Sequence, residues 1–185
     1  MHHSRKSPEQ RTAQQLAARL EQAAIPHAIT GSVAVELHGG RSIQPRVQVI
    51  LNRQGLQSFH QDFAGSAYHD VPGKPRRFVD CETNVPVNIQ ISGHYPGYKS
   101  PGPFSFPDPN EAYQQIDRMR VVTLPWLVQL SLASGRSHEM ADVVSLIQSG
   151  NLDESFLDRL HPAVHRSFLE CLEEKRRDDE FESQQ

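Results

Sequence analysis

Two short stretches near residue 40 carry residues that could hold a phosphate group. Gly31 and Ser32 open a helical pattern, and small residues there let a phosphate approach the backbone N–H groups of a helix N-terminus. Arg41 and Arg46 follow, and a guanidinium can bind phosphate oxygens through charge-assisted hydrogen bonds without a metal ion. Glycine also serves strand-to-helix turns that bind nothing, and Arg46 could instead pair with a surface carboxylate. Both interpretations stay open at this point.

A second set of candidates lies in a loop rich in proline and glycine. His94, Tyr95 and Tyr98 could stack on a base or a sugar, or they could hold the loop against the rest of the chain. We expect the aromatic residues of this loop, Phe104 and Phe106 included, mainly to anchor it. His94 and Tyr95 are kept as candidate ligand contacts.

Three further groups imitate functional motifs but favour structural roles. The basic run at residues 74–77 could contact a phosphate backbone, and we prefer solvated charge on an edge strand. His138, Glu139 and Asp142 share a helical spacing but lack a second histidine, so capping or salt bridging is the better interpretation. His38 lies on an apolar helix face, and we expect it to cap the end of that helix.

The elements that must position these residues follow from hydrophobic periodicity and from proline and glycine punctuation. We expect helices at residues 8–24, 54–63, 125–134, 137–149 and 153–177, a short helix ending at Gly39, and strands at residues 27–30, 46–51, 77–81, 85–91 and 119–124. The strands at 77–81 and 85–91 are expected to form a hairpin, and the strand at 119–124 to lie at an edge. Residues 93–110 hold five prolines and three glycines, which predicts a long surface loop. The last long helix should break near Pro162, and the charged residues 176–185 should fray.

Length and composition predict one globular domain. The chain has 185 residues, of which 37% are hydrophobic and 22% charged, so a packed core is possible and wholesale disorder is excluded. We divide it into a core at residues 1–122, a helical region at 123–178 packed on that core, and a tail at 179–185.

The charge balance and the cysteines exclude several classes of protein. The net charge of −3 gives no global positive field, which argues against a nucleic-acid partner. The apolar stretches are far shorter than the ~20 residues of a membrane span. Cys81 and Cys171 lie far apart without metal-ligand spacing, which argues against disulfides and structural zinc and favours a cytoplasmic protein.

The segment at residues 31–41, Gly-Ser-Val-Ala-Val-Glu-Leu-His-Gly-Gly-Arg, resembles the opening motif of the nucleotidyltransferase superfamily. More specifically, it resembles small bacterial proteins related to the AbiEii toxin and to minimal nucleotidyltransferases. Residues 87–93, 127–134 and 141–143 resemble later parts of the same family, so the likeness covers roughly residues 24–147. It implies an α+β fold in which a small mixed sheet flanked by helices precedes a helical C-terminal region.

The family's metal-binding carboxylates are missing from the matching positions. The resemblance places two aspartates at Arg46 and Gln48 and the third at Asn88, and it places a lysine at Ser131; Asp142 alone keeps its acidic character. Metal-assisted phosphoryl transfer needs anionic ligands for Mg²⁺. The resemblance therefore implies a degenerate member that has lost metal-dependent catalysis and needs no cofactor.

Three hypotheses follow. The first is a binding or scaffold protein that retains nucleotide or phosphate affinity through Gly31, Ser32, Arg41 and Arg46. The second is an active Mg²⁺-dependent nucleotidyltransferase that takes its acids from elsewhere, for instance Asp80, Glu82 or Asp142. The third is an antitoxin-like or regulatory partner in a two-gene system that contacts another protein through its C-terminal helices.

Overall fold

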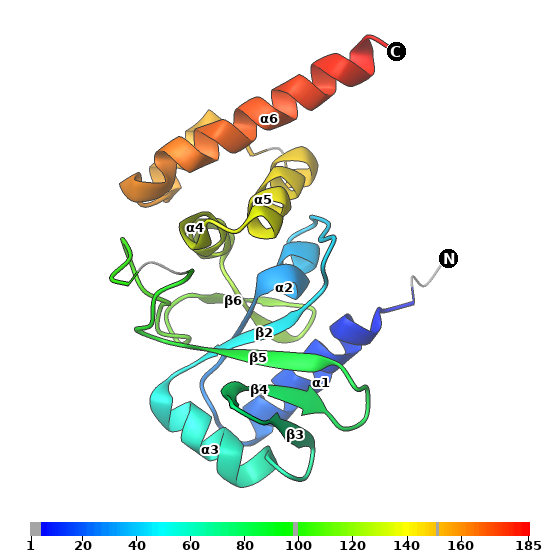
Figure 1. Ribbon diagram of the computed structural model, residues 1–185, viewed down its shortest axis with the longest axis vertical. Coiled ribbons are helices and arrows are strands. Elements are labelled where there is room, and N and C mark those ends of the chain that lie inside the picture. Colours follow the sequence, from blue (N-terminus) through cyan, green and yellow to red (C-terminus); the bar gives the residue numbers. More distant parts are fainter. Residues whose placement is uncertain (1–4, 98–99, 151) are drawn as a thin grey trace.

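Seven strands of the described chain join in one mixed sheet, which helices cover on both faces before the chain ends in further helices (Figure 1). The computed structural model describes residues 5–97, 100–150 and 152–185. The elements are α1 (Pro8–Gln22), β1 (Ala28–Thr30), α2 (Gly31–Leu37), β2 (Val47–Leu51), α3 (Arg53–Phe63), β3 (Tyr68–Val71), β4 (Lys74–Asp80), β5 (Pro86–Ile91), β6 (Tyr113–Ile116), β7 (Met119–Val122), α4 (Leu124–Ser134), α5 (Ser137–Gly150), the 3₁₀ turns η1 (Glu154–Arg159) and η2 (Pro162–Val164), and α6 (His165–Ser183). This architecture confirms the predicted α+β fold class.

The sheet has the strand order β3-β4-β5-β2-β1-β7-β6. β2 runs parallel to β5, and β1 runs parallel to β7, whereas the other neighbours are antiparallel. Helices α1 and α3 lie on one side of the sheet, and α2 and α4 lie on the other (Figure 1). The predicted hairpin of β4 and β5 is confirmed.

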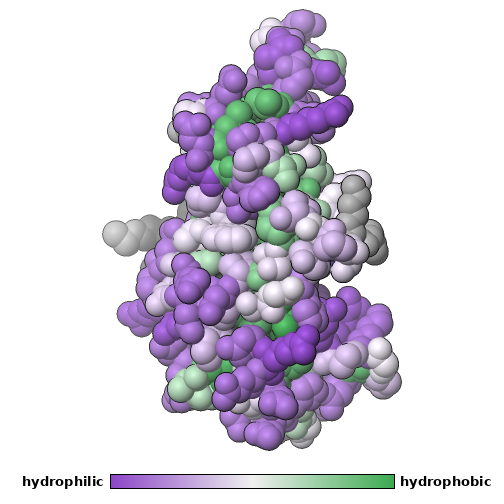
Figure 2. Space-filling model, turned by 90° about the vertical axis from the view of Figure 1, so that its left-hand side faces the viewer, coloured by the Kyte–Doolittle hydropathy of each residue, from purple (hydrophilic) through white to green (hydrophobic). Residues whose placement is uncertain are grey.

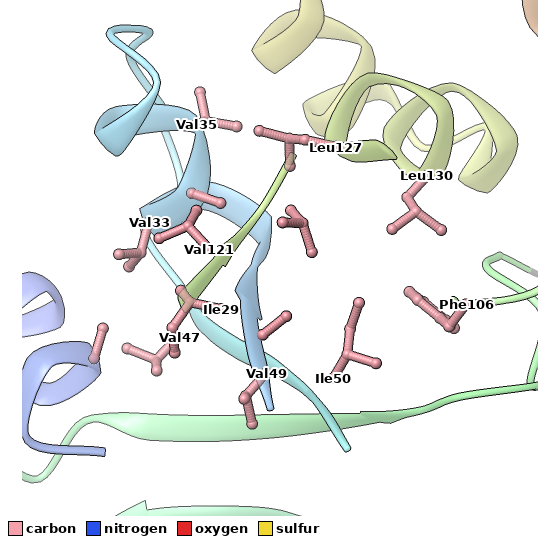
Figure 3. Packing of buried hydrophobic residues seen from close by; sticks show 14 of the residues in the cluster. Ile29, Val33, Val35, Val47, Val49, Ile50, Phe106, Val121, Leu127 and Leu130 are labelled. Atoms are coloured by element: carbon pink, nitrogen blue, oxygen red, sulfur yellow. The ribbon is translucent and has the colours of Figure 1, made fainter. Parts of the chain in front are cut away.

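Local sequence signals explain why the first helix and the central strand form where they do. Ser7 and Gln10 make a capping box in which each side chain binds the other residue's backbone N–H, and this fixes the start of α1. The residues of β2 are buried except Gln48, which is half-buried. Side chains around Ile50, Leu130 and Phe106 point into one region of the core between the sheet, α4 and the long loop (Figure 3).

Two strands were missed by the sequence analysis. β3 and β6 are short, and each has two exposed residues at its centre, so neither shows the alternation that marks a half-buried strand. The turn before β7 also lacks the glycine that would have marked it in the sequence. Asp117 and Arg118, neither of them glycine, take up the positive φ angles there. β6 covers the outer side of β7, so the strand expected at an edge is an inner one, and β3 likewise makes β4 an inner strand.

The C-terminal end differs from the expected frayed tail. α6 continues to Ser183, and the stretch before it, predicted as α-helix, forms the turns η1 and η2 instead. Ion pairs one turn apart stabilise the exposed end of α6, among them Lys175–Asp179 at 2.7 Å and Arg176–Glu180. Such i,i+4 pairs stabilise a helix that buries little apolar surface.

Candidate functional site

A row of polar side chains crosses the middle of the sheet. Thr30 of β1 pairs with Gln48 of β2, Gln48 pairs with Asn88 of β5, and Asn88 pairs with Arg77 of β4. Directly paired residues project to the same face of a sheet, so these four side chains share one face. Arg77 Nε donates a hydrogen bond to Asn88 Oδ1 at 2.8 Å, which joins two of them.

The Gly31–Ser32 pair shapes the end of this row. Gly31 has a φ of +69°, which favours glycine, and a Cβ there would lie 2.9 Å from the Cδ atom of Gln48, so a larger residue would force that amide to shift. Ser32 is buried, and its hydroxyl donates to the carbonyl of Arg46 at 2.8 Å and accepts from the N–H of Arg46. Ser32 therefore fixes the backbone of Arg46 just before β2 and is not itself presented to a ligand.

A cavity of about 420 Å³ lies over this row. Among the described lining residues, Gly31, Arg46, Gln48 and Asn88 were all singled out by the sequence motif, and the cavity brings them together. Its cations are Arg46, Arg77, Lys74, Arg76 and Arg136, and its lining carboxylate is Glu139. Although the chain has a net charge of −3, the described lining of this cavity holds five cations and one acid.

The long loop and α4 form the opposite wall. His94, Tyr95 and Gly97 of the loop line the cavity together with Ser131 and Ser134 of α4. Gly97 has a φ of +77°, and a Cβ there would lie 2.5 Å from the backbone oxygen of Ser134, so the loop rests directly on the end of α4. Tyr95 is 37% exposed at the rim. Tyr98, the third candidate of this loop, lies outside the described residues.

Aromatic anchors hold the loop, as the sequence predicted. Phe106 is buried, and its N–H donates to the carbonyl of His94 at 2.8 Å, which closes the loop on itself. Phe104 packs edge-on against Trp126 of α4, with ring centroids 6.0 Å apart, and it also contacts His161. The cavity wall is therefore built into the core.

The side chain of Arg46 is held at the end of the cavity. Its guanidinium donates to Gln44 Oε1 at 3.0 Å, so the described partner is an amide and not the surface carboxylate that the alternative interpretation expected. Burial raises the pKa of Glu139, and the charges of Arg136 and Arg46 oppose that rise. The described lining of the cavity therefore combines several cations with one carboxylate whose charged form burial disfavours.

Neither a family model nor a curated protein sequence matches this chain. Among solved structures, it is similar to an antigenic nucleotidyltransferase-like protein from Paracoccidioides brasiliensis, with a TM-score of 0.53 and 14% identity over 92% of this chain and 89% of the other. The fold is nucleotidyltransferase-like.

None of the helices in the described part of the chain is both long and apolar enough to cross a membrane.

The side chains at the three matching positions of this nucleotidyltransferase-like sheet do not fit Mg²⁺, which prefers carboxylate oxygens and water as ligands. The three positions that the resemblance assigns to carboxylates hold two amides and a guanidinium. Within the ranges that the structure describes, no three His, Cys, Asp or Glu side chains are placed to hold a metal ion.

The acids considered as replacements lie elsewhere in the fold. Asp80 is fully buried and projects from β4 to the face opposite Arg77, where it lies 3.4 Å from Arg19. It accepts hydrogen bonds from the N–H groups of Glu82 and Thr83 and so shapes the turn after β4. Neither Asp80 nor Glu82 lines the cavity in the described chain.

Arg41 and Asp142 also lie outside the lining of the cavity. Arg41 is exposed, and its backbone N–H donates to Ser145 Oγ of α5 at 2.6 Å. Asp142 is buried on α5, and this burial raises its pKa to about 6 although Ser42 and His138 oppose the rise. These two residues connect α5 to the loop after α2.

His38, which we expected to have a structural role, has one at the end of α2. His38 Nε2 hydrogen-bonds the carbonyl oxygen of Val122 at 2.8 Å, and burial lowers its pKa. It ties the end of α2 to β7 and does not line the cavity in the described chain.

The sequence analysis undervalued the basic run at residues 74–77. It took the strand as an edge strand with solvated charge; β3 occupies that edge instead, whereas Lys74 and Arg76 are exposed as expected. Lys74, Arg76 and Arg77 also line the cavity, together with Arg46. The one signal available was the Pro72–Gly73 pair before the run, which is typical of a hairpin turn.

Proposed function

We propose that this protein binds the phosphate groups of a nucleotide or a related phosphate ester in the cavity without a divalent metal ion. One observation carries the proposal. The positions that the resemblance assigns to metal-binding carboxylates are Arg46, Gln48 and Asn88, and all three line one cavity whose described lining holds five cations and one acid. A guanidinium supplies the positive charge that Mg²⁺ would supply to a phosphate.

The geometry favours phosphate over a neutral ligand. Arg46 and Arg77 bracket the amides of Gln48 and Asn88, so phosphate oxygens placed over the row would meet both charged and neutral N–H donors. Hydrogen bonds to charged groups contribute about 1.5–3 kcal/mol each, roughly twice the contribution of neutral ones.

Loss of metal-dependent catalysis belongs to the same proposal. Asp80, Glu82 and Asp142, the examples considered as replacement acids for an active enzyme, do not line the cavity in the described chain. A closer kinship with the AbiEii and minimal nucleotidyltransferase groups rests on the sequence motifs at residues 31–41, 87–93, 127–134 and 141–143 and stays a prediction.

Calorimetric titration with ATP, CTP, GTP and UTP, each in Mg²⁺ and in EDTA, tests the proposal. We expect at least one nucleotide to bind with the same dissociation constant in both buffers. Binding that appears only with Mg²⁺ would overturn it and favour the active enzyme, which a labelled-nucleotide transfer assay would then test. Absence of binding to all four nucleotides would also overturn it.

A protein partner at the C-terminal helices is a second candidate. Leu169 is 41% exposed on α6, and Phe181 near its end is 64% exposed. Figure 2 shows apolar side chains at the surface near the end of the molecule that carries α6, whereas much of the same face is polar. Substituting Leu169→Ser and Phe181→Ser should abolish such an interaction in a co-purification assay and leave nucleotide binding unchanged.

A further inference from the structure

A second cavity lies between α1 and the hairpin of β6 and β7, and it shares no described lining residue with the cavity over the polar row. Its volume is about 660 Å³, which lies within the range of small-molecule sites. Ala17 and Ala18 of α1 line it with short apolar side chains, which leave room between the helix and the hairpin. We call this space the α1–hairpin cavity.

Arg120 of β7 is held in place at the α1–hairpin cavity. Its Nε atom lies 3.2 Å from Glu21 Oε2, and its Nη2 atom donates to Glu21 Oε1 at 3.4 Å. Its Cζ atom also lies 4.8 Å from the centre of the Tyr113 ring. Within the described chain, no group accepts a hydrogen bond from Nη1. Gln115 pairs with Arg120 across the hairpin and also lines the cavity, so an amide accompanies this fixed guanidinium.

Arg118 occupies a backbone conformation that favours glycine. Ile116 pairs with Met119, so Asp117 and Arg118 form a two-residue turn, and their φ angles are +50° and +63°. Such turns favour glycine at the second position, because an L side chain is strained there. Asp117 forms an ion pair with Lys6 at 3.0 Å, whereas Arg118 is exposed, lines the cavity and has no partner among the described residues. The strained position therefore carries a second guanidinium, and strain of this kind is typical of ligand sites.

His27 supplies a hydrogen-bond acceptor to the same cavity. It is buried, and its Nδ1 atom lies 2.9 Å from the carbonyl oxygen of Ile25. A carbonyl oxygen only accepts hydrogen bonds, so Nδ1 carries the proton and Nε2 of the neutral ring keeps its lone pair. Burial lowers the pKa of His27, the hydrogen bond to Ile25 opposes this, and the charge of Arg120 lowers the pKa further, so the ring is neutral at pH 7. No described residue donates to Nε2.

The charges of the α1–hairpin cavity match a single carboxylate. Arg118 and Arg120 are its described cations and Glu21 is its described acid, which leaves one positive charge to balance. A carboxylate balances that charge, whereas a phosphate monoester carries about −1.5 to −2 at pH 7 and exceeds it. The lone pair of His27 Nε2 also calls for a donor on the ligand, which an amino or hydroxyl group supplies.

We infer that the α1–hairpin cavity binds a small carboxylate that carries an amino or hydroxyl group, with the carboxylate on Arg118 and Arg120 and the N–H or O–H donated to His27 Nε2. The apolar part of the ligand lies against Ala17 and Ala18. The site is independent of the phosphate cavity, so each proposal can hold or fail without the other.

Calorimetric titration with three molecules of similar shape tests this inference. Leucine carries an ammonium group, 2-hydroxy-4-methylpentanoate carries a hydroxyl group, and 4-methylpentanoate carries neither. We expect leucine or the hydroxy acid to bind saturably and at least about fivefold more tightly than 4-methylpentanoate, because only these two satisfy Nε2. The tighter of the two shows whether N–H or O–H is the donor. A smaller preference, or saturable binding of none of the three, would overturn the inference.

Arg118→Gly separates binding from folding. It removes the guanidinium and relieves the strained turn, so ligand affinity should fall at least about tenfold while Tm rises by about 2–4 °C. Asp117→Gly is the matched control, because it relieves the neighbouring strained position, which does not line the cavity in the described chain. It should keep the full affinity. Unchanged affinity in Arg118→Gly, equal losses in both variants, or a loss that comes with a lower Tm would overturn the inference.

The acceptor has a test of its own. His27→Asn keeps an N–H donor for the Ile25 carbonyl and lacks Nε2, so the ratio between the affinities for the donor-bearing ligand and for 4-methylpentanoate should fall to about one. If that variant folds poorly, nitrogen-15 NMR of the wild-type ring replaces it, and the Nε2 resonance of His27 should shift saturably with the calorimetric dissociation constant. A preference that survives in His27→Asn, or an Nε2 resonance that does not move, would overturn the inference.

Discussion

Gln48 lies directly opposite Asn88 across the parallel pair of β2 and β5, where the resemblance assigns two carboxylates. The amides leave this part of the sheet without negative charge, and Arg77 binds Asn88 from the next strand. Under the proposed function, the two amides and the arginine at the positions that the resemblance assigns to acids favour an anion over a metal ion as ligand.

Removal of the Arg46 side chain should weaken nucleotide binding in EDTA. Arg46→Ala should reduce affinity about 10- to 100-fold, because one charge-assisted contact of about 1.5–3 kcal/mol is lost. Calorimetry measures the change. Arg41→Ala is the matched control, since Arg41 is exposed outside the cavity lining and its variant should bind like the wild type. Equal losses in both variants would contradict the assignment of the site.

Carboxylates placed at the three motif positions should create a cation site. The triple variant Arg46→Asp/Gln48→Asp/Asn88→Asp should gain measurable Mg²⁺ affinity and lose metal-free nucleotide binding, because carboxylate oxygens hold Mg²⁺ and repel phosphate. Aspartate is shorter than glutamine, so it fits beside Gly31. A folded triple variant that shows no Mg²⁺ binding by calorimetry would contradict the alignment of these positions.

The buried Asp142 should make stability depend on pH. Burial raises its pKa from 3.8 to about 6, so the folded protein holds this proton more tightly than the unfolded chain, and the contribution of Asp142 to stability falls as pH rises from about 4 to 6. Asp142→Asn lacks this titration. The free energy of unfolding of the variant relative to wild type should therefore rise by about 1–3 kcal/mol between pH 4 and 7. A difference independent of pH in denaturant unfolding would contradict this prediction.

Contact of the loop with α4 should depend on Gly97. Gly97→Ala should destabilise the protein by about 1–3 kcal/mol and weaken ligand binding, because the new Cβ would meet the backbone oxygen of Ser134 and φ is positive. Gly93→Ala is the matched control. Its φ is also positive, at +88°, but a Cβ there meets no atom within 4 Å, so only the backbone strain of about 1–2 kcal/mol applies. Thermal unfolding and ATP titration of both variants would reveal the difference, and equal effects would show that the contact with α4 is unimportant.

Sequence patterns predicted those parts of the fold whose signals are local. The first helix, the apolar run of β2 and the aromatic anchors of the long loop are each determined by residues adjacent in the sequence. β3 and β6 could not be predicted in this way, since their exposed central residues show no alternation and pairing with a neighbour alone makes them strands.

For the candidate site too, sequence motifs predicted some residues, whereas others depend on long-range pairing. Motif spacing singled out Arg46, Gln48 and Asn88, which the fold brings together, but the same spacing singled out Arg41, which the fold turns away. The position of Lys74 and Arg76 in the sheet depends on its strand order, because β4 is an inner strand only when β3 pairs with it. Strand order is a long-range property that no local pattern in this sequence encodes.

The most direct test of metal-free phosphate binding follows the side-chain amide resonances of Gln48 and Asn88 by nitrogen-15 NMR while ATP is added in EDTA. The account predicts that both amide groups and the backbone N–H of Gly31 shift in a saturable way, with one dissociation constant. Saturable shifts that leave these three groups unmoved, or shifts that require Mg²⁺, would contradict it.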